Sequence, residues 1–179
     1  MKNEYDDEHF FNEYAQMTRS REGLAGAGEW HQFRRMFPPL EGSRVLDLGC
    51  GYGWHCKYAV KQGAAKVLGI DVSRRMIREA EKRNQDERIT YEALSLEEYD
   101  YPEKAWDCVV SNLALHYIPD ISAVFQRVHH TLKKEIFISM SINAAFTSWS
   151  FLRHIMQIRR CQWMVMTLRG QTKHSVSLR

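Results

Sequence analysis

The stretch Val45-Leu-Asp-Leu-Gly-Cys-Gly-Tyr-Gly-Trp54 decides the fold of this 179-residue chain. It begins as a short apolar run, typical of a buried strand, and passes into a turn with glycine at every second position. Gly49, Gly51 and Gly53 give this turn backbone freedom and keep side chains away from an approaching ligand. A helix expected over Trp54–Gln62 would present unpaired backbone N–H groups to the same ligand. We therefore expect a binding site at this junction of strand and helix.

Two acidic residues indicate which ligand the turn holds. Asp47 lies two residues before the first glycine, where its charge would repel the pyrophosphate that the related GxGxxG turn binds and would suit an ammonium group. Asp71 follows the next expected strand, Lys66–Ile70, and lies 20 residues after Gly51. An acid at that position accepts hydrogen bonds from the hydroxyls of an adenosine ribose. A nucleoside with a positively charged arm is S-adenosylmethionine, which we predict as the cofactor.

The chain alternates strand-like and helix-like segments between residues 44 and 140. The expected strands are Arg44–Leu48, Lys66–Ile70, Ile89–Ala93, Trp106–Ser111 and Ile136–Met140. The expected helices between them are Trp54–Gln62, Ser73–Asn84 with Ser73 as the N-cap, and Ile121–Leu132. Two more helices, Glu8–Gln16 and Leu24–Met36, precede the first strand. This order predicts an α/β protein with a Rossmann-like, doubly wound, mostly parallel sheet.

The segment VLDLGCGYGWHCKYAVKQGAAKVLGIDVSRRMIREA, residues 45–80, resembles motif I and the following acidic loop of class I methyltransferases. The nearest likeness is to the small-molecule group related to ubiquinone/menaquinone and biotin-pathway enzymes. The resemblance extends over about residues 5–133. It implies S-adenosylmethionine-dependent methyl transfer to a small-molecule acceptor.

The resemblance also implies the residues of the site. The cofactor-binding residues are Tyr14, Met17 and Arg19 in an N-terminal lid; Asp47, Gly49, Cys50, Gly51 and Gly53 at the methionine end; Asp71 at the ribose; Val72, Met76, Ser95 and Leu96 near the adenine; and Ser111 and Asn112 after the fourth strand. Ser95 departs from the family pattern, which has an acid there for the adenine amino group. His116 is the candidate general base, because its ordinary pKa lies near neutral pH.

The charge distribution separates the last part of the chain from the rest. All 22 acidic residues lie within residues 1–135, whereas residues 136–179 hold six Lys or Arg and no acid. We therefore expect a methyltransferase domain over 1–140, with the lid at about 8–36 and the cofactor-binding core at about 43–140, and an atypical basic tail over 141–179. One interpretation makes the tail a basic amphipathic segment, strongest over 146–158, that docks on an anionic surface or partner. The other, which we favour, makes it a truncated or out-of-frame end, because family-like sequence directly precedes it.

The favoured interpretation has a structural consequence. The usual last strands of the family would be missing, which would leave an unpaired sheet edge and promote self-association.

The composition also bears on other classes of function. No signal sequence and no apolar run of about 20 residues is found, so we expect a cytoplasmic protein without a membrane span. The body of the chain lacks the basic surface of a nucleic-acid-binding protein. The four cysteines form no CxxC pair, and His129-His130 has no partner at metal-ligand spacing, so we expect no metal.

Two rival functions stay open. The first is a catalytically silent homologue that binds S-adenosylmethionine without turnover. The second is a nicotinamide-dependent oxidoreductase, which the GxGxG spacing and Asp47 oppose.

Overall fold

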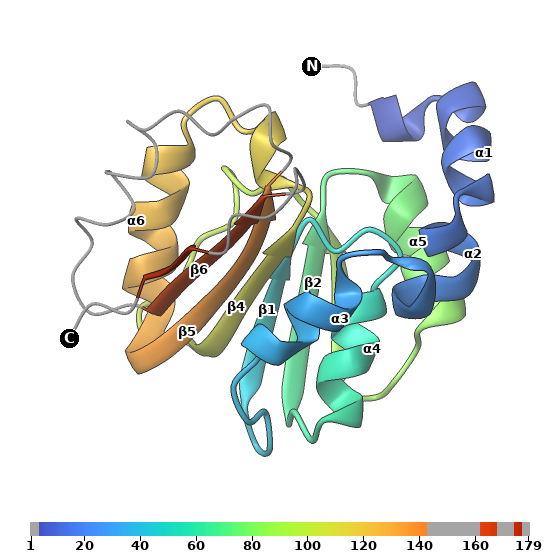
Figure 1. Ribbon diagram of the computed structural model, residues 1–179. Coiled ribbons are helices and arrows are strands. Elements are labelled where there is room, and N and C mark those ends of the chain that lie inside the picture. The colour runs from blue at the N-terminus through green and yellow to red at the C-terminus, as the bar shows by residue number, and fades with distance from the viewer. Residues whose placement is uncertain (1–3, 143–161, 168–173, 177–179) are drawn as a thin grey trace.

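The computed structural model describes residues 4–142, 162–167 and 174–176, and its centre is a seven-stranded sheet with the order β3-β2-β1-β4-β5-β6-β7 (Figure 1). The strands are β1 Arg44–Leu48, β2 Lys66–Asp71, β3 Ile89–Ala93, β4 Trp106–Asn112, β5 Leu132–Ile142, β6 Gln162–Thr167 and β7 His174–Val176. The neighbours from β3 to β6 pair in parallel, and only β7 runs antiparallel to its neighbour. The predicted Rossmann-like, mostly parallel α/β fold is confirmed.

The order of the strands reverses between β1 and β4. From β1 the chain proceeds outward to β2 and β3, and then returns to place β4 on the other side of β1. In open parallel sheets, ligands bind beyond the carboxyl ends of the strands on either side of such a reversal, here β1 and β4. The glycine turn follows β1 directly, so the predicted binding segment lies at this point of the sheet.

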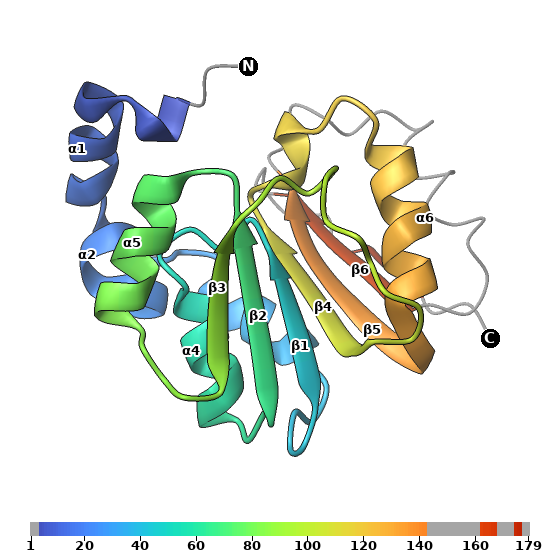
Figure 2. The ribbon, with the colours of Figure 1, turned by 180° about the vertical axis from the view of Figure 1, so that it is seen from behind.

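Helices cover both faces of the sheet. On one face lie α4 (Trp54–Lys61), α5 (Arg74–Arg83) and the short α3 (Trp30–Phe33), and on the other lies α6 (Ile121–Thr131) (Figures 1 and 2). Alternate side chains of β1 show the same division. Val45 packs with Cys56 of α4, whereas Leu46 packs with Val124 of α6. The strands read as nearly continuous apolar runs because both faces are buried.

The sequence located most of these helices closely. α1 spans Glu8–Gln16 as predicted, and Asp7 caps it by accepting from the backbone N–H groups of His9 and Phe10. At the start of α5, the Ser73 hydroxyl accepts a hydrogen bond from the Met76 N–H at 3.2 Å, which confirms the predicted N-cap.

The single helix predicted over Leu24–Met36 is wrong. The structure divides this region into α2 (Thr18–Glu22), the 3-10 turns η2 (Gly23–Gly26) and η3 (Arg34–Met36), and α3 between these turns. Glycine explains the breaks. Gly23 has a φ of +65°, outside the helical range, and a Cβ on Gly26 would lie 2.5 Å from the Thr18 carbonyl oxygen.

The sheet continues beyond β5, where we expected it to end. β6 pairs in parallel with β5 from Phe137↔Gln162 to Ile142↔Thr167, so the bare edge expected at β5 is not found, and β3 and β7 are the outer strands of the described sheet. β7 pairs with β6 in antiparallel fashion from Trp163↔Val176 to Val165↔His174, so an antiparallel pair of strands lies at this end of the described sheet. The amphipathic stretch expected over 146–158 lies outside the described residues.

Within the described ranges, no helix combines the length and apolar character needed to cross a bilayer. In the same part of the chain, no three His, Cys, Asp or Glu side chains come together as a metal site.

Candidate cofactor site

The glycine turn is fixed to the neighbouring strand by its own backbone. The N–H groups of Gly49 and Cys50 both donate to the Ile70 carbonyl oxygen at 2.9 Å, which ties the end of β1 to the end of β2. At Gly49 the φ is +74°, and an added Cβ would overlap the Ala114 side chain, so the loop after β4 packs directly on this glycine. The turn is therefore a rigid element between β1, β2 and the β4 loop.

Gly51, by contrast, borders open space. Its φ is +53°, and the nearest atom to an added Cβ would be the Tyr14 hydroxyl at 4.0 Å. Tyr14 belongs to α1, so the N-terminal segment reaches over the glycine turn as the predicted lid would. A ligand can approach the backbone here without meeting a side chain of the turn.

Asp71 is joined to the glycine turn through its carboxylate. One oxygen accepts from the Gly51 N–H and the other from the Ser73 N–H, each at 2.9 Å. Burial raises the pKa of Asp71 above its ordinary value, although these two backbone hydrogen bonds act in the opposite direction. The carboxylate is thus held in one orientation at the end of β2, with lone pairs left to accept further hydrogen bonds.

Asp47 is almost completely buried in the middle of the sheet, at 1% exposure. Its Oδ2 atom accepts from the Cys56 thiol at 3.3 Å, and its Oδ1 atom has no hydrogen-bond partner among the described residues. Burial raises the pKa of Asp47 to about 7; the Cys56 hydrogen bond lowers it, and the charge of Asp71 raises it. An unpaired buried carboxylate oxygen is costly, and a cationic ligand group would remove that cost.

The lid residues occupy different positions. Tyr14 packs edge-to-face against Tyr5 and Tyr52, whereas the Met17 side chain is 50% exposed. Arg19 forms a two-pronged ion pair with Glu29, in which both Nη atoms lie 3.1 Å from the carboxylate oxygens. The structure thus brings Tyr14 to the turn, joins Arg19 to Glu29, and leaves Met17 at the surface.

Glu29 is a residue that the sequence reasoning missed. It is 6% exposed, and besides Arg19 it accepts a hydrogen bond at 3.1 Å from the side-chain amide of Asn112 at the end of β4. Burial alone would raise the pKa of Glu29, but the Asn112 hydrogen bond and the charge of Arg19 together lower it. No spacing in the sequence marks Glu29, because its importance depends on burial and on partners 10 and 83 residues away.

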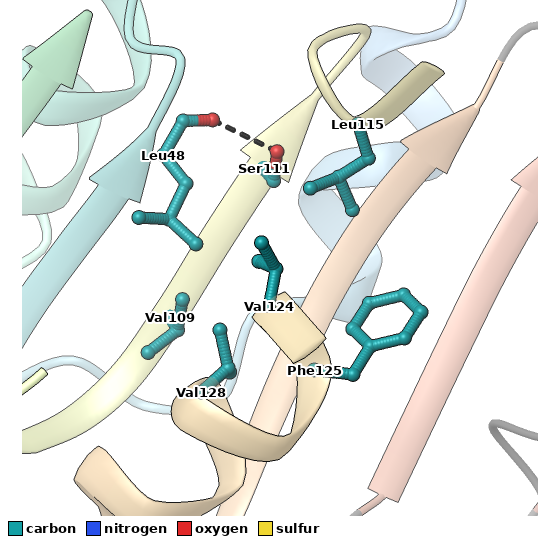
Figure 3. A pocket seen from close by; sticks show the side chains of 7 residues that line it. All are labelled: Leu48, Val109, Ser111, Leu115, Val124, Phe125 and Val128. Carbon is teal, nitrogen blue, oxygen red and sulfur yellow. Dashed lines mark hydrogen bonds between the residues drawn. The ribbon is translucent and has the colours of Figure 1, made fainter. Parts of the chain in front are cut away.

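Ser111 differs from its neighbour Asn112. Its hydroxyl donates to the Leu48 carbonyl oxygen at 2.8 Å, and its side chain borders a small apolar cavity beneath α6 (Figure 3). The other side chains around the cavity are Leu48, Val109, Leu115, Val124, Phe125 and Val128. The cavity measures only about 10 Å³, far too small for a nucleoside. Ser111 joins β4 to β1 on the α6 side of the sheet.

His116 lies in the 3-10 turn η4 (Leu115–Tyr117), just after the β4 loop. Its Nδ1 atom is buried without a hydrogen-bond partner among the described residues, and its ring packs against Tyr117 with centroids 4.1 Å apart. Burial lowers the pKa of His116 below its ordinary value. The imidazole is therefore neutral at pH 7 and able to accept a proton.

The four residues expected near the adenine divide into exposed and buried pairs. Val72 is 52% exposed, and Ser95, after β3, is partly exposed. Met76 and Leu96 are buried at 2% and 5%. The Ser95 hydroxyl accepts from the Glu98 N–H at 3.2 Å, which stabilises the turn after β3. Of the residues expected at the methionine end, Cys50 has its side chain in the core, at 6% exposure.

Comparison with known proteins defines the class to which this fold and site belong. The family described as "Methyltransferase domain" matches residues 45–135, about half of the chain. The chain belongs to this family, and its fold is that of the class I methyltransferases, whose cofactor is S-adenosylmethionine.

Individual relatives agree with this assignment. An S-adenosylmethionine-dependent methyltransferase from Mesorhizobium loti is 42% identical, with a TM-score of 0.61, over 63% of this chain and 52% of that one. An uncharacterized protein from Haemophilus influenzae is 33% identical over 72% of this chain and 53% of its own length. A ubiquinone biosynthesis O-methyltransferase from Rhodopseudomonas palustris is 32% identical over 62% of this chain and 44% of its own length. The chain thus spans about half the length of these relatives.

Proposed function

We propose that this chain holds S-adenosylmethionine across the carboxyl ends of β1 and β2 and transfers its methyl group to a small-molecule acceptor. One observation carries the proposal: Asp47 and Asp71 flank a glycine turn from adjacent strands, and the Oδ1 atom of Asp47 is buried without a hydrogen-bond partner among the described residues. The unpaired Oδ1 fits the ammonium group of the cofactor. The fixed Asp71 carboxylate fits its two ribose hydroxyls.

The bound cofactor supplies an electrophilic methyl group with a good leaving group, so the protein contributes alignment and exclusion of water. Tyr14 and Arg19 cover the glycine turn from the N-terminal side. Gly51 leaves room for the amino-acid arm, because the nearest described atom to a Cβ built on this glycine is the Tyr14 hydroxyl oxygen, at 4.0 Å. Val72, Met76, Ser95 and Leu96 are the proposed surroundings of the adenine.

We assign proton removal to His116 for acceptors that carry a proton on the attacking atom. Its lowered pKa keeps the ring neutral at pH 7, and its Nδ1 atom has a free lone pair among the described contacts. Glu29 is unsuited to this role, because Arg19 and Asn112 stabilise its charged form. An acceptor that attacks through a free amine would not need the histidine.

Release of S-adenosylhomocysteine tests the proposal, measured with S-adenosylmethionine and a panel of phenol, quinol, carboxylate and amine acceptors. Turnover with one class of acceptor, lost in Asp71→Ala, would support it. Tight cofactor binding without release for any acceptor would favour the silent homologue. Tighter binding of NADH than of S-adenosylmethionine would contradict both functions.

A further inference from the structure

Glu29 connects two parts of the protein that are far apart in the sequence. Its Oε1 atom accepts from Arg19 Nη1 and from Asn112 Nδ2, and its Oε2 atom accepts from Arg19 Nη2, all at 3.1 Å. Arg19 belongs to α2 in the lid, and Asn112 is the last residue of β4. One buried carboxylate thus fastens the lid to the carboxyl end of the central strands.

The side chains of Glu29 and Arg19 differ in how deeply they are buried. The Glu29 side chain is 3% exposed, whereas the Arg19 side chain is 29% exposed. A guanidinium has five N–H donors, and the two-pronged contact with Glu29 uses only two of them. Arg19 therefore keeps an accessible side with donors to spare, while its orientation is set by Glu29.

Tyr14 links Arg19 to the glycine turn. Burial raises the pKa of Tyr14, the charge of Arg19 lowers it, and the charge of Asp71 raises it, so Tyr14 lies within electrostatic reach of both. The Tyr14 hydroxyl in turn lies 4.0 Å from the position of a Cβ on Gly51. Arg19 is thus the cation of the lid beside the space assigned to the amino-acid arm of the cofactor.

We propose that Glu29 is a positioning residue that holds Arg19 in the orientation in which its remaining N–H groups receive the carboxylate of the cofactor's amino-acid arm. The inference rests on the proposed function and assigns a different residue to each charged group of that arm. Asp47 meets the ammonium group, and Arg19 meets the carboxylate. Glu29 touches neither group and acts through Arg19, while Asn112 fixes Glu29 to β4.

The test compares two ligands that differ in the arm. S-adenosylmethionine carries the arm, and 5′-methylthioadenosine has the same adenosine and sulfur without it. Calorimetric titration of the full chain with each ligand is done for wild type, Glu29→Gln and Arg19→Lys, with Glu22→Gln as the matched control. Glu22 is an exposed acid at the end of α2, so its substitution removes the same charge and leaves the Arg19–Glu29–Asn112 contacts, here called the clamp, unchanged.

We expect Glu29→Gln and Arg19→Lys each to weaken S-adenosylmethionine binding by about tenfold or more and to leave 5′-methylthioadenosine binding within about twofold of wild type. Arg19→Lys keeps the positive charge and loses the two-pronged guanidinium contact, so it serves as the second variant if Glu29→Gln fails to fold. Amide hydrogen exchange of the unliganded protein should also be faster over residues 18–22 in Glu29→Gln than in Glu22→Gln, because the clamp that fastens α2 is lost.

Two results would overturn the inference. Equal weakening of both ligands would mean that Glu29 only maintains the fold, and undiminished S-adenosylmethionine binding in both variants would mean that the arm does not meet Arg19. Failure of the wild type to bind either ligand would instead contradict the proposed function. The two failures are therefore distinguishable.

Discussion

The Asp71 carboxylate accepts a hydrogen bond from the Gly51 backbone N–H at 2.9 Å, and this contact joins the two sequence features that indicated the cofactor. The residues are 20 positions apart: Gly51 lies in the turn after β1, and Asp71 is the last residue of the adjacent strand β2. The acid thus orients the turn. Several consequences of this arrangement are measurable.

Gly51 and Gly42 allow backbone strain to be separated from ligand exclusion. Both have positive φ, +53° and +69°, and an added Cβ meets only the Tyr14 hydroxyl at 4.0 Å at Gly51 and nothing within 4 Å at Gly42. Gly51→Ala and Gly42→Ala should each lower the free energy of unfolding by about 1–2 kcal/mol. Only Gly51→Ala should reduce cofactor affinity, by about tenfold or more, measured by titration beside chemical denaturation. Equal affinities in the two variants would contradict the assigned position of the ligand.

The raised pKa of Asp47 predicts that cofactor affinity depends on pH. Burial places this pKa at about 7, and an ammonium group binds the carboxylate form, so affinity should rise by about tenfold per pH unit up to pH 7 and then level off. The Cys56 thiol and the Asp71 carboxylate, the groups that act on Asp47, are retained in Asp47→Asn. That variant should bind weakly and lose most of this pH dependence. A pH-independent affinity in the wild type would exclude Asp47 as the ammonium partner.

The same pKa predicts the opposite trend for the unliganded fold. The folded pKa of about 7 lies above the ordinary value of 3.8, so the folded state binds more protons between these values. Stability should therefore fall as the pH rises from about 4 to about 7, and Asp47→Asn should remove that decline. Other titrating groups contribute to the total, and the difference between wild type and variant isolates Asp47. Urea denaturation at several pH values provides the measurement.

The Ser73 hydroxyl has a second function besides capping α5. It donates to the Asp6 carboxylate at 2.7 Å, which fastens the turn Glu4–Asp6, just before the lid, to the start of α5. Asp120, which caps α6 by accepting from the Ala123 N–H at 3.0 Å, is the matched control. Ser73→Ala and Asp120→Ala should each lower the free energy of unfolding by about 1 kcal/mol. Only Ser73→Ala should accelerate amide exchange over residues 8–16; similar exchange in the two variants would argue against this attachment of the lid.

The sequence was sufficient to predict the alternating core, because each strand is buried on both faces and each crossover helix has an apolar side. The bounds of β1 and α1 were predicted without error, and the Ser73 cap was recognised from its residue type and position. Local patterns of this kind depend on neighbours within a few positions. The folded structure keeps these locally predicted elements because the tertiary packing is consistent with them.

The sequence-based predictions failed where contacts between residues far apart in the chain determine the structure. The segment 24–36 has helix-forming residues, but the approach of Gly26 to Thr18 breaks it into short turns. The Ser111 hydroxyl donates to the Leu48 backbone 63 residues earlier in the chain, a contact that no local pattern indicated. Glu29 was overlooked because its burial and its two partners exist only in the folded molecule. The pairing of β6 with β5 was not anticipated, because no family-like pattern marks residues 162–167 in the sequence.

Titration with S-adenosylmethionine of the wild type, Asp71→Ala and Asp86→Ala tests the central claim most directly. Asp86 is the matched control, because it also accepts from the N–H two residues later, Arg88, at 3.1 Å, but lies in the loop after α5. We predict that the wild type and Asp86→Ala bind alike and that Asp71→Ala binds at least about tenfold more weakly while remaining folded. Wild-type affinity in a folded Asp71→Ala protein, or no binding by the folded wild type, would contradict the assignment of this turn as the cofactor site.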